Sequence, residues 1–242
     1  MKTIIIGDIH GRYNQLRVVL DLINFDPTRD RLICLGDYLN YGPDSQLVVN
    51  YLIYCGKQSP RHLFLRGNHE STVLDCWSGL SLRAGFLDLD PGLRTIRSYG
   101  RDPDEAAARS RKIADREGLK EFVGWIFPSD HLEFFNATVP CAWLDKIFTS
   151  HAGLIRDLPI EAHKPDYYYW GDRSWVDTRS PDDQPPVVCG HWHQPEEPLV
   201  EYKKILMAVQ DNLAVLWLEE QTIINSEGIS WPIDPDWQLV KK

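Results

Sequence analysis

Short apolar runs recur along the chain, and each is bounded by glycine, proline or charged residues. Runs of four to six apolar residues with such boundaries are typical of buried β-strands. Five strands are therefore expected, at residues 3–6, 31–35, 62–65, 146–149 and 186–189.

Two helical patterns separate the first three predicted strands. Apolar residues share one helical face at Leu16, Val19, Leu20 and Ile23, and another at Leu47, Val48, Tyr51, Leu52 and Cys55. The resulting β-α-β-α-β order predicts right-handed crossovers and a largely parallel α/β core.

Residues 71 to about 130 interrupt this alternation. An irregular stretch at 79–92 is expected to precede one helix, with Asp102 as its N-cap, Pro103 at its first position and Gly118 at its end. We expect this helical insertion to lie over one edge of the core.

The last third of the chain carries weaker patterns. Residues 205–209 and 213–218, on either side of 210–212, predict a β-hairpin. Residues from about 221 to 242 predict an irregular tail. With 43% hydrophobic residues, the whole chain, 1–242, is expected to form a single domain.

Composition narrows the classes of protein that fit. The net charge is 26 minus 35, or −9, which argues against nucleic acid as a partner. No stretch approaches the length of a membrane-spanning helix, and the N-terminus does not resemble a signal peptide. Five cysteines without a C-x-x-C pair fit a reducing compartment. We expect a cytoplasmic protein without a membrane partner, and make no prediction of its oligomeric state.

The five predicted strands end in potential metal ligands. These are Asp8 and His10, then Asp37, then Asn68 followed by His69, then His151, and finally His191 and His193. Ligands of open α/β sheets bind at the carboxyl ends of the strands, so these side chains are expected to converge. Five of the eight histidines lie at these ends, which makes coincidence a poor explanation.

The residue types indicate which ions would bind. Carboxylates, an amide oxygen and neutral imidazoles suit manganese, iron or zinc better than calcium or copper. The simplest arrangement has two divalent ions about 3.5 to 4 Å apart, as in two-metal hydrolytic sites. Asp37 would bridge them, with Asp8, His10 and His193 on one ion and Asn68, His151 and His191 on the other.

The sequence around these residues resembles a known family. The motifs G-D-x-H-G, G-D-x-x-x-x-G-P-D-S, L-R-G-N-H-E, S-H-A-G and G-H-x-H occur at 7–11, 36–45, 65–70, 150–153 and 190–193. As a set they resemble the calcineurin-like metallophosphoesterases, in the branch of serine/threonine protein phosphatases and symmetrical diadenosine tetraphosphate hydrolases. The likeness covers about residues 1–220 apart from the insertion, and implies a four-layer α/β/β/α sandwich with a dinuclear site at the sheet edge.

The resemblance also implies a mechanism. A hydroxide bridging the two ions would attack phosphorus in line, while His69 protonates the leaving oxygen. Arg66 would offer a planar fork to the phosphate oxygens, although a structural role in the core is the alternative. Asn68 and Tyr41 would also lie close enough to contact the substrate.

Two residues depart from the phosphatase pattern G-D-x-V-D-R-G. Asn40 replaces the carboxylate that normally partners the catalytic histidine, so it can orient His69 but supports its imidazolium form less well. Tyr41 replaces an arginine that clamps phosphate. Arg12 or Arg173 could supply the missing charge. Arg173 is preferred because relatives often carry an arginine near this aromatic segment, although here it falls one position late.

These features leave three functional hypotheses. The first is a manganese-dependent hydrolase of phosphomonoesters, on proteins or small molecules. The second is hydrolysis of dinucleoside polyphosphates, with Tyr38, Tyr41 or the aromatic residues of 167–175 stacking on adenine. The third is a weakly active protein that binds a phosphorylated ligand. A dinucleotide-dependent oxidoreductase is disfavoured, because no G-x-G-x-x-G follows the first strand.

Overall fold

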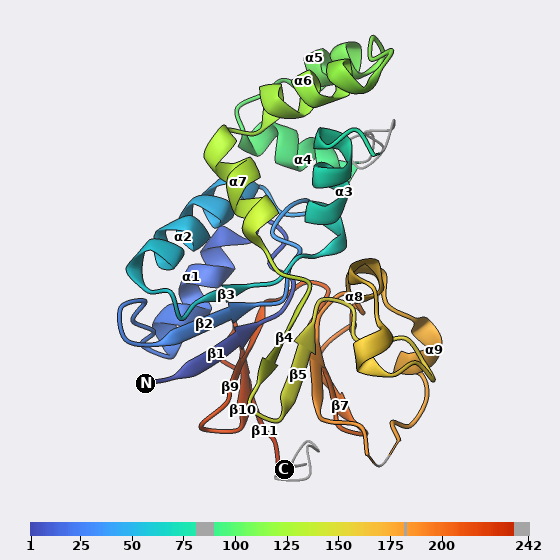
Figure 1. Ribbon diagram of the computed structural model, residues 1–242. Helices are drawn as coiled ribbons and strands as arrows, with labels where there is room; N and C mark the ends of the chain where they lie inside the picture. The colour runs from blue at the N-terminus through green and yellow to red at the C-terminus, as the bar shows by residue number, and fades with distance from the viewer. Residues whose placement is uncertain (81–89, 182, 235–242) are drawn as a thin grey trace.

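The computed structural model describes residues 1–80, 90–181 and 183–234, and within them two mixed β-sheets face each other (Figure 1). The first sheet has the order β11-β10-β9-β1-β2-β3. Its strands are β1 (Thr3–Ile6), β2 (Arg31–Cys34), β3 (Leu63–Phe64), β9 (Ala214–Trp217), β10 (Thr222–Asn225) and β11 (Ser230–Pro232). The three N-terminal strands run parallel, as the β-α-β-α-β pattern predicts, and β9 pairs antiparallel with β1.

The second sheet has the order β4-β5-β6-β8-β7. Its strands are β4 (Cys141–Leu144), β5 (Ile147–Ser150), β6 (Val187–Cys189), β7 (Leu199–Glu201) and β8 (Lys204–Leu206). The strands β5, β6 and β8 are parallel, whereas the outer strands β4 and β7 are antiparallel to their neighbours. All five strands expected from the apolar runs are present, each within a residue or two of its predicted bounds.

Alternation along β1 explains the layering. Ile4 and Ile6 pack against α1 (Tyr13–Leu22) and α2 (Ser45–Gln58), whereas Ile5 points to the second sheet. Side chains alternate across a strand, so one strand contributes to two cores. The outer face of the second sheet is covered by α8 (Pro165–Trp170) and α9 (Arg173–Val176). The four-layer α/β/β/α sandwich is therefore confirmed.

The insertion is a group of helices rather than one. After α3 (Asn68–Trp77) come α4 (Asp90–Ser98), α5 (Pro103–Ser110), α6 (Arg116–Ile126) and α7 (Ser129–Ala137), at the top of Figure 1. Residues 81–89 of the stretch expected to be irregular lie outside the described residues. Pro91 and Gly92 begin a helix, so that expectation is wrong for them.

The helix predicted from Asp102 to Gly118 begins as expected but is too long. The Asp102 carboxylate accepts a hydrogen bond from Glu105 N at 2.8 Å, and α5 ends at Ser110. Asp115 then caps a new helix by accepting from Gly118 N at 2.8 Å. Gly118 thus lies at the third position of α6, because a second N-cap residue interrupts the pattern.

The predicted hairpin is wrong, since its two arms belong to different sheets. Strand β8 lies in the second sheet and β9 in the first, and one bridge between Ala208 and Leu213 connects their ends. Residues on both faces of β8 and of β9 are buried almost throughout, so both strands are continuous apolar runs. Such runs do not indicate which strands they pair with.

The predicted irregular tail is also wrong up to residue 232. It contains β10 and β11, which pair with each other and extend the first sheet beyond β9. Ile223 of β10 packs between the two sheets. Residues 235–242 lie outside the described residues. In the parts of the chain that the structure describes, every helix is too short or too polar to cross a bilayer.

The second N-cap gives a testable prediction for the insertion. Asp115→Ala removes the acceptor for Gly118 N and should lower the free energy of unfolding by about 1 kcal/mol. For a chain of this size, thermal unfolding should shift by about 2 to 4 °C. Glu121→Ala, at an exposed position within α6, is the control and should change stability by less than about 0.5 kcal/mol. Equal effects of the two variants would contradict the capping role.

Candidate metal centre

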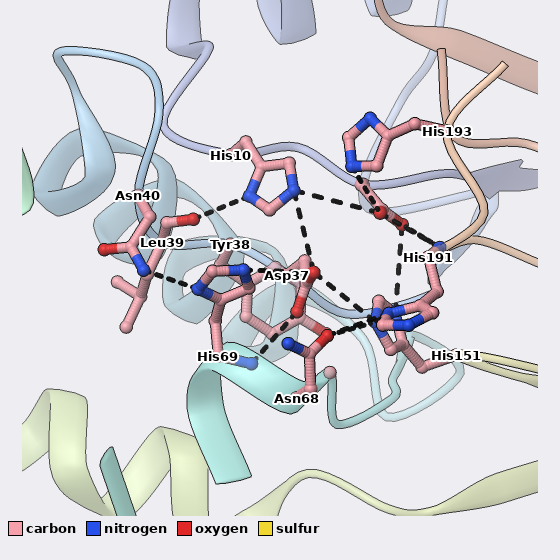
Figure 2. Close-up of polar contacts among 12 residues, drawn as sticks. His10, Asp37, Tyr38, Leu39, Asn40, Asn68, His69, His151, His191 and His193 are labelled. Carbon is pink, nitrogen blue, oxygen red and sulfur yellow. Dashed lines mark hydrogen bonds and ion pairs between the residues drawn. The ribbon is translucent and has the colours of Figure 1, made fainter. Parts of the chain in front are cut away.

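The ends of four strands and the start of one helix meet at a single site (Figure 2). Strands β1, β2, β5 and β6 run into it, and α3 begins there. The structure brings together all seven predicted metal ligands, namely Asp8, His10, Asp37, Asn68, His151, His191 and His193. They come from both sheets, so the site lies where the carboxyl ends of the two sheets meet.

The first group of ligands surrounds the Asp8 carboxylate. His10 Nε2 and His193 Nε2 each lie 3.8 Å from Asp8 Oδ2. His10 Nδ1 lies 2.8 Å from the Leu39 carbonyl, to which it donates, so Nε2 presents its lone pair to the carboxylates. His10 Nε2 is buried and has no hydrogen-bond partner. An unpartnered buried nitrogen aimed at carboxylates is the arrangement that a cation would complete.

The second group surrounds the Asn68 amide oxygen. This oxygen lies 2.9 Å from His151 Nε2 and 3.0 Å from His191 Nδ1, and the two nitrogens are 3.2 Å apart. His151 Nδ1 lies 3.0 Å from the Leu35 carbonyl and donates to it, which directs Nε2 into the site. One amide oxygen and two imidazole nitrogens therefore converge on one point, which is the donor set of a first-row divalent metal.

Asp37 lies between the two groups. Its Oδ2 is 3.6 Å from His10 Nε2 and 3.4 Å from His151 Nε2. Its Oδ2 is also 3.7 Å from His69 Nε2. This placement fits the predicted role of Asp37 as a ligand shared by two ions. The donor chemistry and the unpartnered His10 nitrogen both fit a dinuclear centre.

Burial controls the protonation of the ligands. It raises the pKa of Asp8 to about 6, with His151 opposing it, and lowers the pKa of His10 and of His191 to about 3. These two imidazoles are therefore neutral and keep a lone pair for a metal. Burial also acts on Asp37, but His151 and other histidines outweigh it and hold its pKa well below the usual value.

The loops of the site have an uncommon backbone conformation. His10, Asp37, Asn40, Tyr41 and His191 all have φ between 46° and 70°, in the left-handed region. Residues other than glycine adopt this region at a cost of about 1–3 kcal/mol, and such residues cluster at functional sites. The surrounding structure must therefore hold these loops in place.

Glu70, in the first turn of α3, holds the loop after β2. Its carboxylate is fully buried and accepts hydrogen bonds from Asp37 N at 2.9 Å, Tyr38 N at 2.9 Å and Gly67 N at 3.2 Å. Leu39 N donates at 3.3 Å. Glu70 was not among the residues predicted to have a role. The sequence does contain a sign of this role: Glu70 lies three residues after Gly67, the position from which an acidic side chain reaches back to the N-cap of a helix.

Two glycines make room for the carboxylates. A Cβ at Gly67 would lie 2.1 Å from Asp37 Oδ1, and a Cβ at Gly190 would lie 1.9 Å from Asp8 Oδ1. Neither position can hold a larger residue without moving a predicted ligand. Glycine is thus required just before Asn68 and His191, because a carboxylate lies too close to the backbone there for any side chain to fit.

His69 and Asn40 form a pair, as the sequence predicts. Asn40 Nδ2 lies 2.5 Å from His69 Nδ1, while His69 Nε2 faces Asp37. Tyr41 lies beside them, with its ring edge-on to His10 at a centroid distance of 4.6 Å. Its side chain is 44% exposed and covers one side of the metal centre.

The two predicted phosphate-binding arginines make structural contacts. Arg66 donates to Thr138 Oγ1 at 3.1 Å and to the Asn136 carbonyl at 3.0 Å, which favours the structural role left open above. Arg173 pairs with Asp177 at 3.0 Å. The proposal that either one binds phosphate rests on sequence alone.

Arg12 lies in the wall of a cavity of about 520 Å³ beside the metal centre. The same cavity is lined by Tyr41, Arg94, His193 and Asp211. Of the two candidates for the missing charge, Arg12 is the one at the cavity, where its guanidinium also donates to the carbonyls of Val209, Gln210 and Asn212. Arg94, on α4 of the insertion, was missed, since no motif surrounds it in the sequence.

The aromatic residues considered for stacking differ in accessibility. Tyr38 is fully buried and its hydroxyl donates to the Leu65 carbonyl at 2.5 Å, so it cannot contact a base. Tyr168 and Tyr169, both in α8, are buried against the outer face of the second sheet, which supports their role in packing. Tyr41 is the member of the set that reaches the cavity.

Comparisons with known proteins agree with this geometry. The model of the calcineurin-like phosphoesterase family matches residues 1–205. A symmetrical bis(5'-nucleosyl)-tetraphosphatase of Photorhabdus laumondii is 43% identical over 81 residues, which cover 34% of this chain and 28% of that protein. Its namesake from Methylococcus capsulatus is 32% identical over 148 residues, covering 61% and 47%. The matches thus span less than half of either relative.

Solved structures show the same fold. A crystal structure provisionally assigned as a diadenosine tetraphosphatase aligns with a TM-score of 0.64 at 20% identity, covering 93% of this chain and 92% of that one. A metallophosphoesterase from Sphaerobacter thermophilus aligns with a TM-score of 0.53 at 16% identity, covering 93% and 86%. At these identities the likeness concerns the fold alone.

Loss of one predicted ligand should weaken metal binding. In His10→Ala the first group loses the nitrogen that lacks any other partner. Manganese affinity, measured by calorimetric titration of chelator-treated protein, should fall by more than about 10-fold. Loss of a residue that only supports a ligand already costs about 10-fold, so loss of a ligand itself should cost more. His163→Ala, outside the site, should leave the affinity unchanged. Unaltered affinity in His10→Ala would remove His10 from the ligand set.

Loss of an acceptor oxygen at Glu70 should destabilise the loop after β2. Glu70→Gln places an amide NH₂ against backbone N–H donors, and should lower the free energy of unfolding by about 3 kcal/mol. Urea unfolding of the metal-free protein measures this effect without interference from metal binding. The exposed substitution Glu133→Gln serves as the control. A loss no larger than that of the control would show that Glu70 does not hold the loop.

Proposed function

The chain belongs to the calcineurin-like phosphoesterase family, a family of hydrolases acting on phosphoester bonds, and within it we propose that this chain hydrolyses dinucleoside polyphosphates such as diadenosine tetraphosphate. The sequence placed phosphomonoesters first and dinucleoside polyphosphates second. The names of the relatives from Photorhabdus laumondii and Methylococcus capsulatus support the second hypothesis better.

The observation that carries this proposal is the cavity beside the metal centre. His193 is both a predicted metal ligand and part of the cavity wall, so a ligand in the cavity reaches the metal centre directly. Arg12 and Arg94 place two positive charges in that wall. A polyphosphate carries several negative charges beyond the phosphate at the metals, and arginine matches phosphate oxygens in charge and geometry.

The same cavity offers surfaces for a nucleoside. The exposed face of Tyr41 can stack on a base, as aromatic side chains do in nucleotide-binding proteins. Asp211 lies in the same wall, where its oxygens can accept hydrogen bonds from sugar hydroxyls. A phosphopeptide has neither a base to stack on Tyr41 nor a sugar to bond to Asp211.

The chain's own residues would share the chemical work. Asp8, His10 and His193 would hold one divalent ion, Asn68, His151 and His191 the other, and Asp37 both. We propose manganese, with iron or zinc as alternatives. When bound, such ions would lower the pKa of a bound water to about 7 and would polarise phosphate oxygens. His69, whose Nε2 faces Asp37, would contact the leaving oxygen, and Tyr41 would shield one side of the site.

Phosphomonoester hydrolysis is the second candidate, supported by membership of the family alone. A weakly active protein that binds a phosphorylated ligand is the third. Substrate preference distinguishes a dinucleoside polyphosphate hydrolase from a phosphomonoesterase. Turnover faster than that of a variant without the Asp37 carboxylate distinguishes either enzyme from a binding protein.

The test compares substrates on one preparation. With manganese added, the ratio kcat/KM for diadenosine tetraphosphate should exceed that for a phosphoserine peptide by more than about 10-fold, the effect of one charge-assisted contact. Asp37→Asn should abolish both activities. A preference for the peptide would overturn the proposed substrate class, and wild-type rates equal to those of Asp37→Asn would favour a binding protein.

The cavity wall gives a second prediction. Arg94→Ala should raise KM for diadenosine tetraphosphate by about 10-fold through loss of one charge-assisted contact. KM for a small aryl phosphate, which does not extend into the cavity, should change little. Arg97→Ala, an exposed arginine on the same helix, is the matched control. Equal changes for the two substrates would place Arg94 outside the polyphosphate site.

A further inference from the structure

Arg12, two residues after His10, binds the backbone of residues 208–212, the segment that joins β8 to β9. Its Nη1 donates to the carbonyls of Asn212 at 2.8 Å and of Val209 at 3.2 Å. Its Nη2 donates to the Gln210 carbonyl at 2.5 Å. Three of the five N–H groups of the guanidinium are thus bound to one short stretch of backbone.

A second side chain of α1 binds the same segment. Gln15 Nε2 donates to the Asp211 carbonyl at 3.2 Å, so the carbonyls of the four residues 209–212 are all bound by α1 side chains. Arg12 is the N-cap of α1, and its own backbone N donates to the Ile9 carbonyl at 3.0 Å. The arginine is therefore anchored both to the helix and to the loop after β1.

The 208–212 segment also pairs with the residue directly after His193. Gln194 N donates to the Ala208 carbonyl at 2.8 Å, and Gln210 N donates to the Gln194 carbonyl at 3.0 Å. One side of the segment is thus bound to the guanidinium, and the other side is bound to the backbone beside a predicted metal ligand.

The ring of His193 is held differently from the rings of two other predicted ligands. His10 and His151 each donate from Nδ1 to a backbone carbonyl, which fixes the direction of Nε2. Among the described residues, His193 has no hydrogen bond of this kind, and its side chain is 38% exposed. Metal-binding histidines are usually oriented by a partner on the other ring nitrogen. The approach of His193 Nε2 to Asp8 Oδ2, at 3.8 Å, therefore depends on where its backbone is held.

We propose that Arg12 is a positioning residue of the metal centre, which holds His193 beside the Asp8 carboxylate through the 208–212 segment. The ion of the first ligand group then depends on Arg12, whereas the ion of the second group, around the Asn68 amide oxygen, does not. This inference rests on the metal ligands of the proposed function, and it holds for any substrate.

The sign of the effect on metal binding separates this role from an effect of charge. Arg12 follows His10 closely in the chain and lines the same cavity as His193. A positive charge near a cation site disfavours the cation, so removal of the charge alone should strengthen metal binding. Removal of a residue that positions His193 should weaken it instead. Without substrate in the measurement, contacts between Arg12 and phosphate do not contribute.

The first experiment is a calorimetric titration of chelator-treated protein with manganese, in which the wild type should bind two ions. Arg12→Met keeps the apolar stem but has no N–H groups, and should weaken binding of one ion by about 10-fold, the effect of losing a residue that supports a ligand. Binding of the other ion should be unchanged. Stronger binding, equal weakening of both ions or no change would overturn the inference.

Arg61→Met is the matched control for this titration. Arg61 is an exposed arginine whose Nη2 donates to the Thr28 carbonyl at 2.9 Å, away from the metal centre. Its replacement removes a contact of the same kind between a guanidinium and a carbonyl. Both ion affinities should stay at the wild-type values, and a loss equal to that of Arg12→Met would remove the specific role of Arg12.

A double-mutant cycle tests whether the effect passes through His193. His193→Ala should weaken the same ion as Arg12→Met, and the two changes together should cost less than about 2-fold more than His193→Ala alone, because coupled residues are not additive. In the His191→Ala background, which lacks a ligand of the other group, Arg12→Met should still cost about 10-fold. Equal losses in both backgrounds would show that Arg12 does not act through His193.

A further readout requires neither metal nor substrate. Hydrogen exchange of the metal-free protein, followed by NMR, should show protected N–H groups at Gln194 and Gln210, and Arg12→Met should speed their exchange by more than about 10-fold. Exchange at Leu32, whose N–H donates to His62, should keep its wild-type rate. Unchanged exchange at both glutamines, or the same acceleration at Leu32, would overturn the positioning role.

The inference and the proposed function can fail separately. If Arg12→Met weakens one of two ions while the wild type hydrolyses neither diadenosine tetraphosphate nor a phosphopeptide, the proposed function fails and the positioning role stands. If the wild type is active and Arg12→Met binds both ions with unchanged affinity, the function stands and the inference fails. A wild type that binds no ion would overturn both.

Discussion

Burial of two carboxylates side by side is the constraint on which this structure depends. Asp8 and Asp37 are 3% and 2% exposed, and both lie within 4 Å of the same His10 nitrogen. Such charges are costly to remove from water unless cations and hydrogen-bond donors offset them. Strained loops, the buried Glu70 carboxylate and the close approach of Gly67 and Gly190 are understood as the means of keeping this cluster assembled.

Much of the fold was readable from the sequence because its main signals are local. The strands β1, β2 and β6 are apolar runs that stop at glycine, and the residues after them are the chelating ones. Their convergence followed from the rule that parallel strands share one functional edge. The contact between Asn40 and His69 was likewise anticipated from two motifs.

What the sequence did not predict depends on tertiary contacts. The apolar arms at 205–209 and 213–218 look like a hairpin until their partners are known, because buried strands carry no mark of their sheet. Arg66 and Arg173 were judged by residue type, whereas their contacts are set by the Asn136 carbonyl and by Asp177. The helix α4 contains no motif, and Arg94 gains its significance only from where this helix packs, beside the cavity.

The metal ligands are divided between the two sheets, and this division has a thermodynamic consequence. Asp8 and Asp37 follow strands of the first sheet, whereas His151 and His191 follow strands of the second. Ions bound by all four would join the layers across their interface, so ion binding and cohesion of the sandwich become linked equilibria. The ion concentration around the protein would then set its resistance to unfolding as well as its catalytic competence.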